Sequence, residues 1–152
     1  MQTLFRSLAA WLAALAFCAP AFAAGQGTAD EATALVKKAV AYYKAHGRDK
    51  ALAEFNNAKG QFVDRDLYIF VIDTKGQMLA HGANPRIVNK QVLEMRDVDG
   101  EFLFKKMIAT AQSKGTGWVN YKWPNPISDG YQAKSTYIEK ADDIIVGCGI
   151  YK

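Results

Sequence analysis

The sequence contains little cysteine and little histidine. Its two cysteines are Cys18 and Cys148, and its two histidines are His46 and His81. Cys18 falls in a segment that we expect to be removed, so the mature chain cannot form an intramolecular disulfide and must be stabilised by its core. One cysteine and two histidines are also a poor set of metal ligands. We therefore expect neither a metal site nor another cofactor.

Motifs of common enzyme classes are also absent. The sequence has no G-x-S-x-G elbow, no P-loop, no H-E-x-x-H pair and no dinucleotide-binding glycine motif. No nucleophile has an adjacent base. Residues 97–100 resemble part of a calcium loop, but the first and last ligand positions hold Met95 and Lys106, which cannot bind calcium. We predict that the protein is not an enzyme.

The excess of positive charge is small. The chain has 19 Lys and Arg against 15 Asp and Glu, a net charge of +4. Removing residues 1–23 takes out one arginine and no acidic residue, which leaves a net charge of +3. The basic residues are scattered among acidic ones, so there is no basic stripe of the kind that a phosphate backbone requires. Nucleic acid is not expected as a partner.

The first residues have the order of a secretory signal. Arg6 precedes an apolar run over residues 8–18, and Ala21 and Ala23 form the small-x-small pattern that signal peptidase cleaves. The apolar run is shorter than the roughly 20 residues that a membrane span needs, so we expect cleavage after Ala23, although retention as an anchor stays open. Residues 1–23 are then a signal peptide, and residues 24–152 form one domain.

The next region predicts two helices and a hairpin. Thr28 and Glu31 have the spacing of a capping box, and the helix that they begin continues to Gly47. Asp49 is a candidate cap for a second, shorter helix. A continuous apolar run over residues 67–72, turn residues 73–76 and a second run over 78–80 predict two strands.

The second half of the sequence predicts one helix and three strands. Asp99 is a candidate cap for a helix that ends at Gly115. Strands are expected over residues 117–123, 132–139 and 144–151, because turn residues separate these segments. The chain should therefore adopt an α+β fold with a five-stranded antiparallel sheet.

Several aromatic residues lie close in the sequence to Lys134, on the strands expected over residues 117–123 and 132–139. Tyr121 and Trp123 lie two residues apart and face the same side of a strand, and Lys134 follows on the next strand. If Lys134 points to that side, its buried amine needs a partner, which a ligand carboxylate could supply with help from the hydroxyl of Tyr121 or Tyr137. In the alternative interpretation the aromatic residues are ordinary core, and the lysine reaches solvent along its aliphatic chain.

At these residues the sequence resembles the single Cache domain family, in particular its second type, whose members are extracytoplasmic sensor modules of bacterial chemoreceptors and histidine kinases. The resemblance covers nearly the whole mature chain. Its motifs occur in family order: the first helix, residues 67–73 with Gly76, residues 81–85, 97–100 and 117–124, Lys134 with Tyr137, and residues 146–151. Each motif is weak alone, but the ordered series is specific.

The resemblance implies a PAS-like fold with a long N-terminal helix, a crossing helix and a ligand pocket beside the sheet. Ligands of similar domains include acetate, propionate, pyruvate and lactate. The matching positions make a set of candidate ligand-binding residues: Lys134, Tyr121, Trp123, Tyr137, His81, Asn84, Arg86 and Met107. Met107 is equally consistent with ordinary core.

Family members usually lie between two membrane helices, but this sequence has no second apolar span. Direct transmembrane signalling is therefore not expected, and a soluble periplasmic sensor module could instead buffer or scavenge a small organic acid, or present it to a separate membrane receptor or kinase. The competing interpretation is an interaction module without a ligand, whose first helix forms a homodimer or docks on a membrane protein.

Overall fold

The computed structural model describes residues 25–128 and 130–152. The predicted signal peptide, residues 1–23, lies outside the described residues, so its cleavage stays a prediction. Across the two described ranges, none of the helices combines the length and the apolar character needed to cross a bilayer.

Two consecutive helices begin the domain. Helix α1, Ala29–His46, starts with the predicted capping box: the Thr28 hydroxyl accepts from the amide of Glu31, and the Glu31 carboxylate accepts from the amide of Thr28. Helix α2 is Arg48–Phe55. Asp49 was predicted as its cap, which is wrong, because Gly47 with φ +79° ends α1 and begins α2 directly, leaving Asp49 in the first turn.

The predicted strand over residues 67–72 is interrupted. Residues Val63–Asp64 form β1 and pair with β2, Leu67–Tyr68, whereas β3, Phe70–Asp73, joins the large sheet. Between them the amide of Ile69 donates to the carbonyl of Phe62, while its carbonyl accepts from the amide of Gly82. The backbone thus changes partners at this residue, which an unbroken apolar run does not reveal.

A hairpin and a long loop follow β3. Strand β4 is Met78–His81, and the Asp73 carboxylate holds the connecting turn by accepting from the amides of Lys75 and Gln77, each at 2.8 Å. The loop then contains the short 3-10 helix η1, Pro85–Ile87, and leads to α3, Leu103–Lys114.

Helix α3 starts later than predicted. Asp99 does not cap it, because the Asp97 carboxylate accepts from the amides of Asp99 and Glu101 and folds this segment into a turn. The helix begins after Phe102, without a side-chain cap, and ends at Gly115 as predicted.

The last three strands are long and antiparallel. They are β5, Thr116–Pro124, β6, Tyr131–Ala141, and β7, Ile144–Tyr151. The sheet order is β4-β3-β7-β6-β5, with antiparallel pairing throughout, so the predicted α+β, PAS-like architecture with five antiparallel strands is confirmed.

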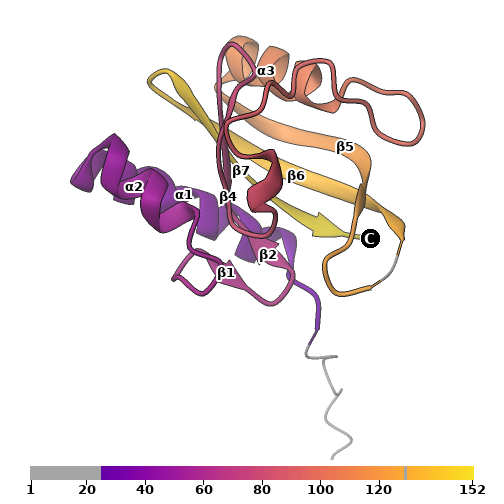
Figure 1. The fold of residues 1–152 in the computed structure, drawn as a ribbon, viewed down its shortest axis with the longest axis horizontal. Coiled ribbons are helices and arrows are strands. Elements are labelled where there is room, and N and C mark those ends of the chain that lie inside the picture. The colour runs from indigo at the N-terminus through magenta and orange to yellow at the C-terminus, as the bar shows by residue number, and fades with distance from the viewer. Residues whose placement is uncertain (1–24, 129) are drawn as a thin grey trace, which may run out of the picture.

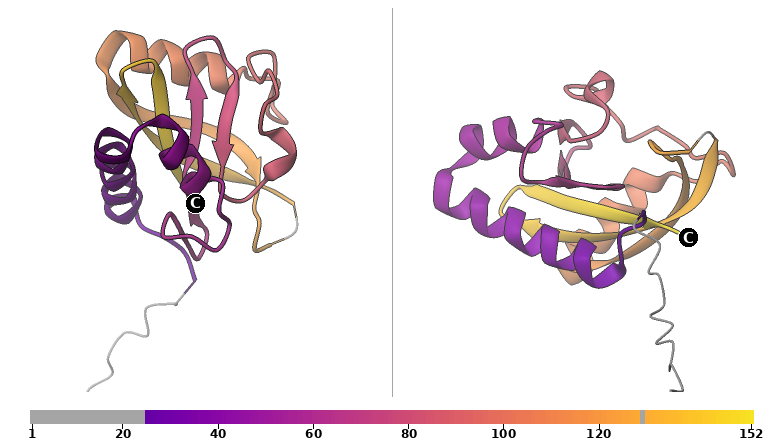
Figure 2. Two further views of the ribbon diagram at one scale, coloured as in Figure 1. Left: turned by 60° about the vertical axis from the view of Figure 1, so that its left-hand side comes forward. Right: turned by 90° about the horizontal axis from the view of Figure 1, so that it is seen from below.

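Each face of the sheet is covered by a different part of the chain. On one face α1 and α2 pack against β3, β6 and β7 through side chains such as Val36, Phe55 and Val146. On the other face Met107 and Ile108 of α3 pack against residues such as Ile138. Figure 1 shows the element order, and the right-hand view in Figure 2 shows α1 running along the sheet. The candidate site lies on the face that carries α3.

Candidate functional site

Lys134 is buried in the middle of the sheet, and 2% of its surface is exposed. It lies on β6 directly opposite Tyr121 of β5 and Tyr151 of β7, so all three side chains share the α3 face. Gly149 makes room for it, since a Cβ atom there would lie 2.3 Å from Cε of Lys134. The small residue on β7 thus allows the long side chain to run along the sheet.

The Lys134 amine is surrounded by tyrosines. Its Nζ atom donates to the hydroxyls of Tyr68, at 2.7 Å, and Tyr151, at 3.1 Å. It also lies 4.1 Å and 4.3 Å from the centroids of those two rings, within the range of cation–π attraction. Among the described residues no carboxylate lies within ion-pair distance of Lys134.

Burial changes the acidity of this amine. Removing the ammonium from water lowers the pKa of Lys134 to about 7, although attraction to Cys148 and Asp66 opposes the fall. An amine with two neutral hydrogen-bond partners and three protons has one donor left. The site therefore holds a buried cation that lacks a counter-ion.

His81 supplies a second, neutral donor. Its Nδ1 atom accepts from the amides of Ala83, at 3.3 Å, and Asn84, at 2.9 Å. Burial and the nearby charge of Lys134 lower the pKa of His81 to about 3, so the ring is neutral at physiological pH. Because Nδ1 is an acceptor, the ring proton is on Nε2, which has no hydrogen-bond partner among the described residues. The loop after β4 thus fixes the tautomer of the ring.

An open pocket of about 540 Å³ lies between the loop after β4 and the end of β5. Its lining combines aromatic, proline and amide side chains with one guanidinium: Tyr68, His81, Ala83, Asn84, Pro85, Arg86, Trp123, Pro124, Asn125 and Pro126. No acidic residue is among these. The Lys134 amine lies behind the Tyr68 hydroxyl, which belongs to the pocket wall. The pocket is therefore rich in hydrogen-bond donors and free of negative charge.

The structure brings most of the predicted site residues together. His81, Asn84, Arg86 and Trp123 line the pocket, and Lys134 lies beneath it. Tyr121 points to the same side but does not line the pocket, and its hydroxyl is engaged with Oγ1 of Thr136 at 2.7 Å. Tyr121 therefore lies on the same face as the pocket without forming part of its lining.

Two predicted residues lie elsewhere. Tyr137 is three positions from Lys134, so the alternation of side chains along β6 places it on the opposite face, where its ring contacts Trp118. Met107 is fully buried in the core between α3 and the sheet, and it does not line the pocket. The structure thus places these two residues outside the lining of this pocket.

Sequence reasoning missed the two tyrosines that hold the lysine amine. Tyr68 lies in an apolar run in which every residue looks like core, so nothing in the run marks its hydroxyl. Tyr151 could have been predicted. Pairing the residues of the two strands outward from the two-residue turn at Asp142 and Asp143 places Tyr151 opposite Lys134.

Comparisons with known proteins agree with this architecture. A family model described as single Cache domain 2 matches residues 6–152. The chain is 37% identical over 90 residues to the methyl-accepting chemotaxis protein McpP of Pseudomonas putida, covering 58% of this chain and 16% of McpP. It is 30% identical over 89 residues to the sensor histidine kinase MctS of Rhizobium johnstonii, covering 57% of this chain and 19% of MctS. Each match thus spans less than a fifth of the relative.

Solved structures of sensor domains are also similar to this chain. A periplasmic sensor domain of a chemotaxis protein is 25% identical, with a TM-score of 0.63 over 80% of this chain and 88% of that one. A Cache chemosensory domain described for carboxylic acid recognition is 26% identical, with a TM-score of 0.69 over 80% of this chain and 91% of that one. A methyl-accepting chemotaxis protein from Vibrio parahaemolyticus, 23% identical with a TM-score of 0.69 over 80% of this chain and 86% of that one, shares the fold.

Proposed function

The chain belongs to the single Cache domain 2 family of sensor domains, and from this membership we propose that it is an exported protein that binds a short-chain carboxylate above Lys134. The ligand is of the acetate, propionate, pyruvate or lactate type. The protein acts as a soluble binding or accessory signalling component that serves a membrane receptor or kinase. Its relatives McpP and MctS, a chemotaxis receptor and a sensor kinase, support this role.

One observation carries the choice of ligand: the pocket wall, together with the buried Lys134 that is bonded to it through Tyr68, holds donors that lack an acceptor. Lys134 has a third proton, Tyr68 accepts from Lys134 and keeps its own hydroxyl proton, and His81 holds a proton on Nε2. A carboxylate accepts hydrogen bonds only, and it would supply the negative charge that the buried amine lacks. The solved neighbour described for carboxylic acid recognition supports the same ligand class.

The size of such ligands limits the affinity. At about 1.5 kcal/mol per heavy atom, a four-atom ligand such as acetate gains at most about 6 kcal/mol, which corresponds to tens of micromolar. Pyruvate and lactate have six heavy atoms and can approach micromolar dissociation constants. Micromolar affinity is therefore expected.

Titration calorimetry on the protein purified from the periplasm of producing cells tests this function. At least one of the four acids should bind with micromolar affinity, and Tyr68→Phe should weaken that binding about tenfold, because a hydrogen bond to a charged group is lost. Tyr137→Phe is the matched control, since this tyrosine lies on the opposite face and should not affect affinity. Absence of heat for all four acids, or equal affinity of Tyr68→Phe and the unchanged protein, would contradict the proposal.

The proposed export depends on the predicted signal peptide, and the mass of the periplasmic protein tests its cleavage. Cleavage after Ala23 gives a chain that begins at Ala24, whereas a retained leader leaves the full mass. The apolar run and the small-x-small pattern support cleavage. Dimerisation through α1 stays a prediction.

A further inference from the structure

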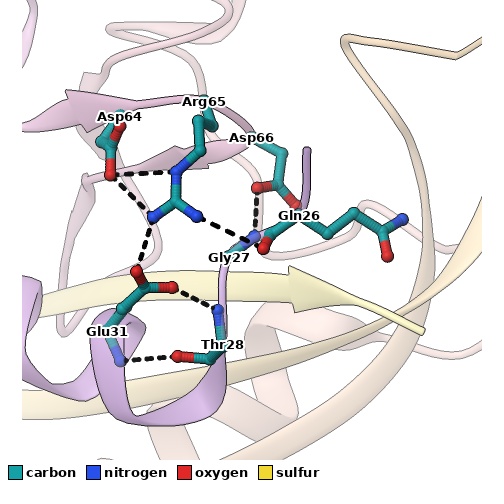
Figure 3. A network of polar contacts seen from close by, with 7 residues as sticks. All are labelled: Gln26, Gly27, Thr28, Glu31, Asp64, Arg65 and Asp66. Carbon is teal, nitrogen blue, oxygen red and sulfur yellow. Dashed lines mark hydrogen bonds and ion pairs between the residues drawn. The ribbon is translucent and has the colours of Figure 1, made fainter. Parts of the chain in front are cut away.

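The turn between β1 and β2 is held to the start of α1 by an ion pair and hydrogen bonds. In Figure 3 the Arg65 guanidinium lies between the carboxylates of Asp64 and Glu31, at 2.8 Å from each, and also reaches the carbonyl of Gln26. Arg65 has a φ of +58°, a conformation that few residues other than glycine adopt. We call residues 64–66 together with residues 26–31 the N-terminal clasp.

Asp66 is the buried member of the N-terminal clasp. Its side chain is fully buried, and its Oδ1 atom accepts from the amide of Gly27 at 2.6 Å. Its Oδ2 atom is also buried and has no hydrogen-bond partner among the described residues. A buried carboxylate with one hydrogen bond depends strongly on charges in its surroundings.

The N-terminal clasp is joined to the pocket by two residues. Asp66 is followed directly by β2, in which Leu67 packs against Gly27 and Tyr68 accepts a hydrogen bond from the Lys134 amine. A Cβ atom at Gly27 would lie 2.3 Å from Cγ of Leu67, so this contact leaves no free space. Tyr68 of the pocket and Gly27 before α1 are therefore linked through a single intervening residue, Leu67.

Electrostatics connects the same groups. The positive charge of Lys134 attracts the carboxylate of Asp66, and this attraction partly offsets the lowering of the Lys134 pKa by burial. No ion pair joins them directly, so the attraction acts through the low-dielectric interior. A carboxylate ligand at Lys134 would cancel this attraction and add a negative charge on the pocket side.

We propose that a carboxylate in the pocket loosens the N-terminal clasp, because its negative charge offsets the attraction between Lys134 and the buried Asp66, which directly precedes β2. The inference rests on the proposed function and extends it: occupancy of the pocket is reported at the start of α1. By linkage, the intact clasp lowers the affinity for the ligand by the same factor.

Hydrogen exchange of the periplasmic protein measures the N-terminal clasp directly. With saturating sodium propionate at pH 6, exchange at residues 27–31 should become at least about fivefold faster than in equimolar sodium chloride, the low end of typical couplings. Exchange in β3, Phe70–Asp73, should slow or stay unchanged, because binding stabilises the domain as a whole. Equal or slower exchange at residues 27–31 would overturn the inference.

A second comparison needs no ligand and separates this inference from the proposed function. Lys134→Met removes both the charge and the hydrogen bond to Tyr68, so residues 27–31 should exchange faster than in the unchanged protein. If propionate does not bind, the proposed function fails for that acid, and this comparison alone decides whether the coupling exists. Unchanged exchange in Lys134→Met would overturn the inference.

Asp66→Asn tests whether the N-terminal clasp in turn affects the affinity for the ligand. The amide oxygen can still accept from Gly27, but the charge is gone, so propionate should bind about fivefold more tightly and no longer alter exchange at residues 27–31. Asp49→Asn is the matched control, since this exposed carboxylate lies on α2, outside the N-terminal clasp. It should leave affinity unchanged. Equal effects of the two substitutions on affinity would contradict a specific role for Asp66.

Discussion

Tyr151 faces Lys134 across the β6–β7 pair, and its hydroxyl accepts from the lysine amine at 3.1 Å while donating to the carbonyl of Pro124 at 2.8 Å. Pro124 belongs to the pocket wall, so one phenol connects the buried amine to the rim. This connection orients the amine even before a ligand is present. Preorganised donors bind an anion without first losing conformational freedom.

Replacing Lys134 with methionine should abolish binding without lowering stability. Removing the buried ammonium should raise the free energy of unfolding by about 1–3 kcal/mol at pH 7, as when other buried charges are replaced by apolar groups. Calorimetry and thermal denaturation measure both effects. Lys140→Met, at an exposed position near the end of the same strand, is the control and should retain binding.

The stability gain should shrink at high pH. The pKa of Lys134 is about 7 in the folded protein and near its ordinary value of 10.5 when unfolded, so the unfolded chain binds more protons between these values. The unchanged protein therefore becomes more stable as pH rises through this range, relative to the methionine variant. A stability difference independent of pH from 7 to 10 would show that the amine is not desolvated.

Carboxylate binding should depend on pH through Lys134. A bound anion favours the ammonium, so affinity should be constant from about pH 5 to 7 and fall up to tenfold per pH unit above that. His81, with a pKa of about 3, and Tyr151 and Cys148, each with a pKa raised to about 12, keep one protonation state throughout. Burial also raises the pKa of Tyr68. Calorimetry at several pH values gives the profile, and constant affinity up to pH 9 would argue against a role for the amine.

The fold could be predicted because its signals are local. The capping box at Thr28 and the turns before β6 and β7 mark element boundaries without knowledge of distant contacts. One predicted helix start differs from the structure because of a nearby side chain. Asp99 was expected to cap the helix, but the Asp97 carboxylate accepts from the amides of Asp99 and Glu101 and folds this segment into a turn. A single sequence does not show which of two nearby carboxylates accepts those amides.

The site could be predicted only in part, because its contacts join distant positions. Lys134 and Tyr68 are 66 residues apart, and their contact depends on β2 pairing with β1 outside the large sheet. The side on which Tyr137 lies follows from the sequence alone, since residues three apart on a strand face opposite sides. Arg86 and Asn84 were predicted as site residues from the family resemblance. They lie in the loop after β4, and the periodicity of apolar residues does not predict where a loop residue points.

His81→Asn should separate the two roles of this ring. The asparagine oxygen can replace Nδ1 as acceptor for the amides of Ala83 and Asn84, but no donor remains at the Nε2 position. The loop should keep its conformation while carboxylate affinity falls about tenfold, the cost of one hydrogen bond to a charged group. Calorimetry and circular dichroism measure these effects, and His81→Leu, which lacks both functions, should also loosen the loop. Unchanged affinity in His81→Asn would remove the ring from the site.

Gly149→Ala should disturb Lys134 directly. A Cβ atom at this position would lie 2.3 Å from Cε of Lys134 and from Oγ1 of Thr136, so the side chains must shift at a cost of about 1–3 kcal/mol. Affinity should fall together with stability. Gly25→Ala is the control, because no atom lies within 4 Å of a Cβ there. In a Lys134→Ala background the penalty should be smaller, since one of the two clashes is absent, and an equal penalty would contradict the proposed steric role.

The strand order β4-β3-β7-β6-β5 places the last strand in the centre of the sheet. During synthesis from the N-terminus, β3–β4 and β5–β6 can form only as separate hairpins until β7 is inserted between them. Such non-local pairing slows folding and keeps the chain unfolded until nearly all of it has been made. A chain that ends before β7 therefore lacks the strand that joins the two hairpins into one sheet.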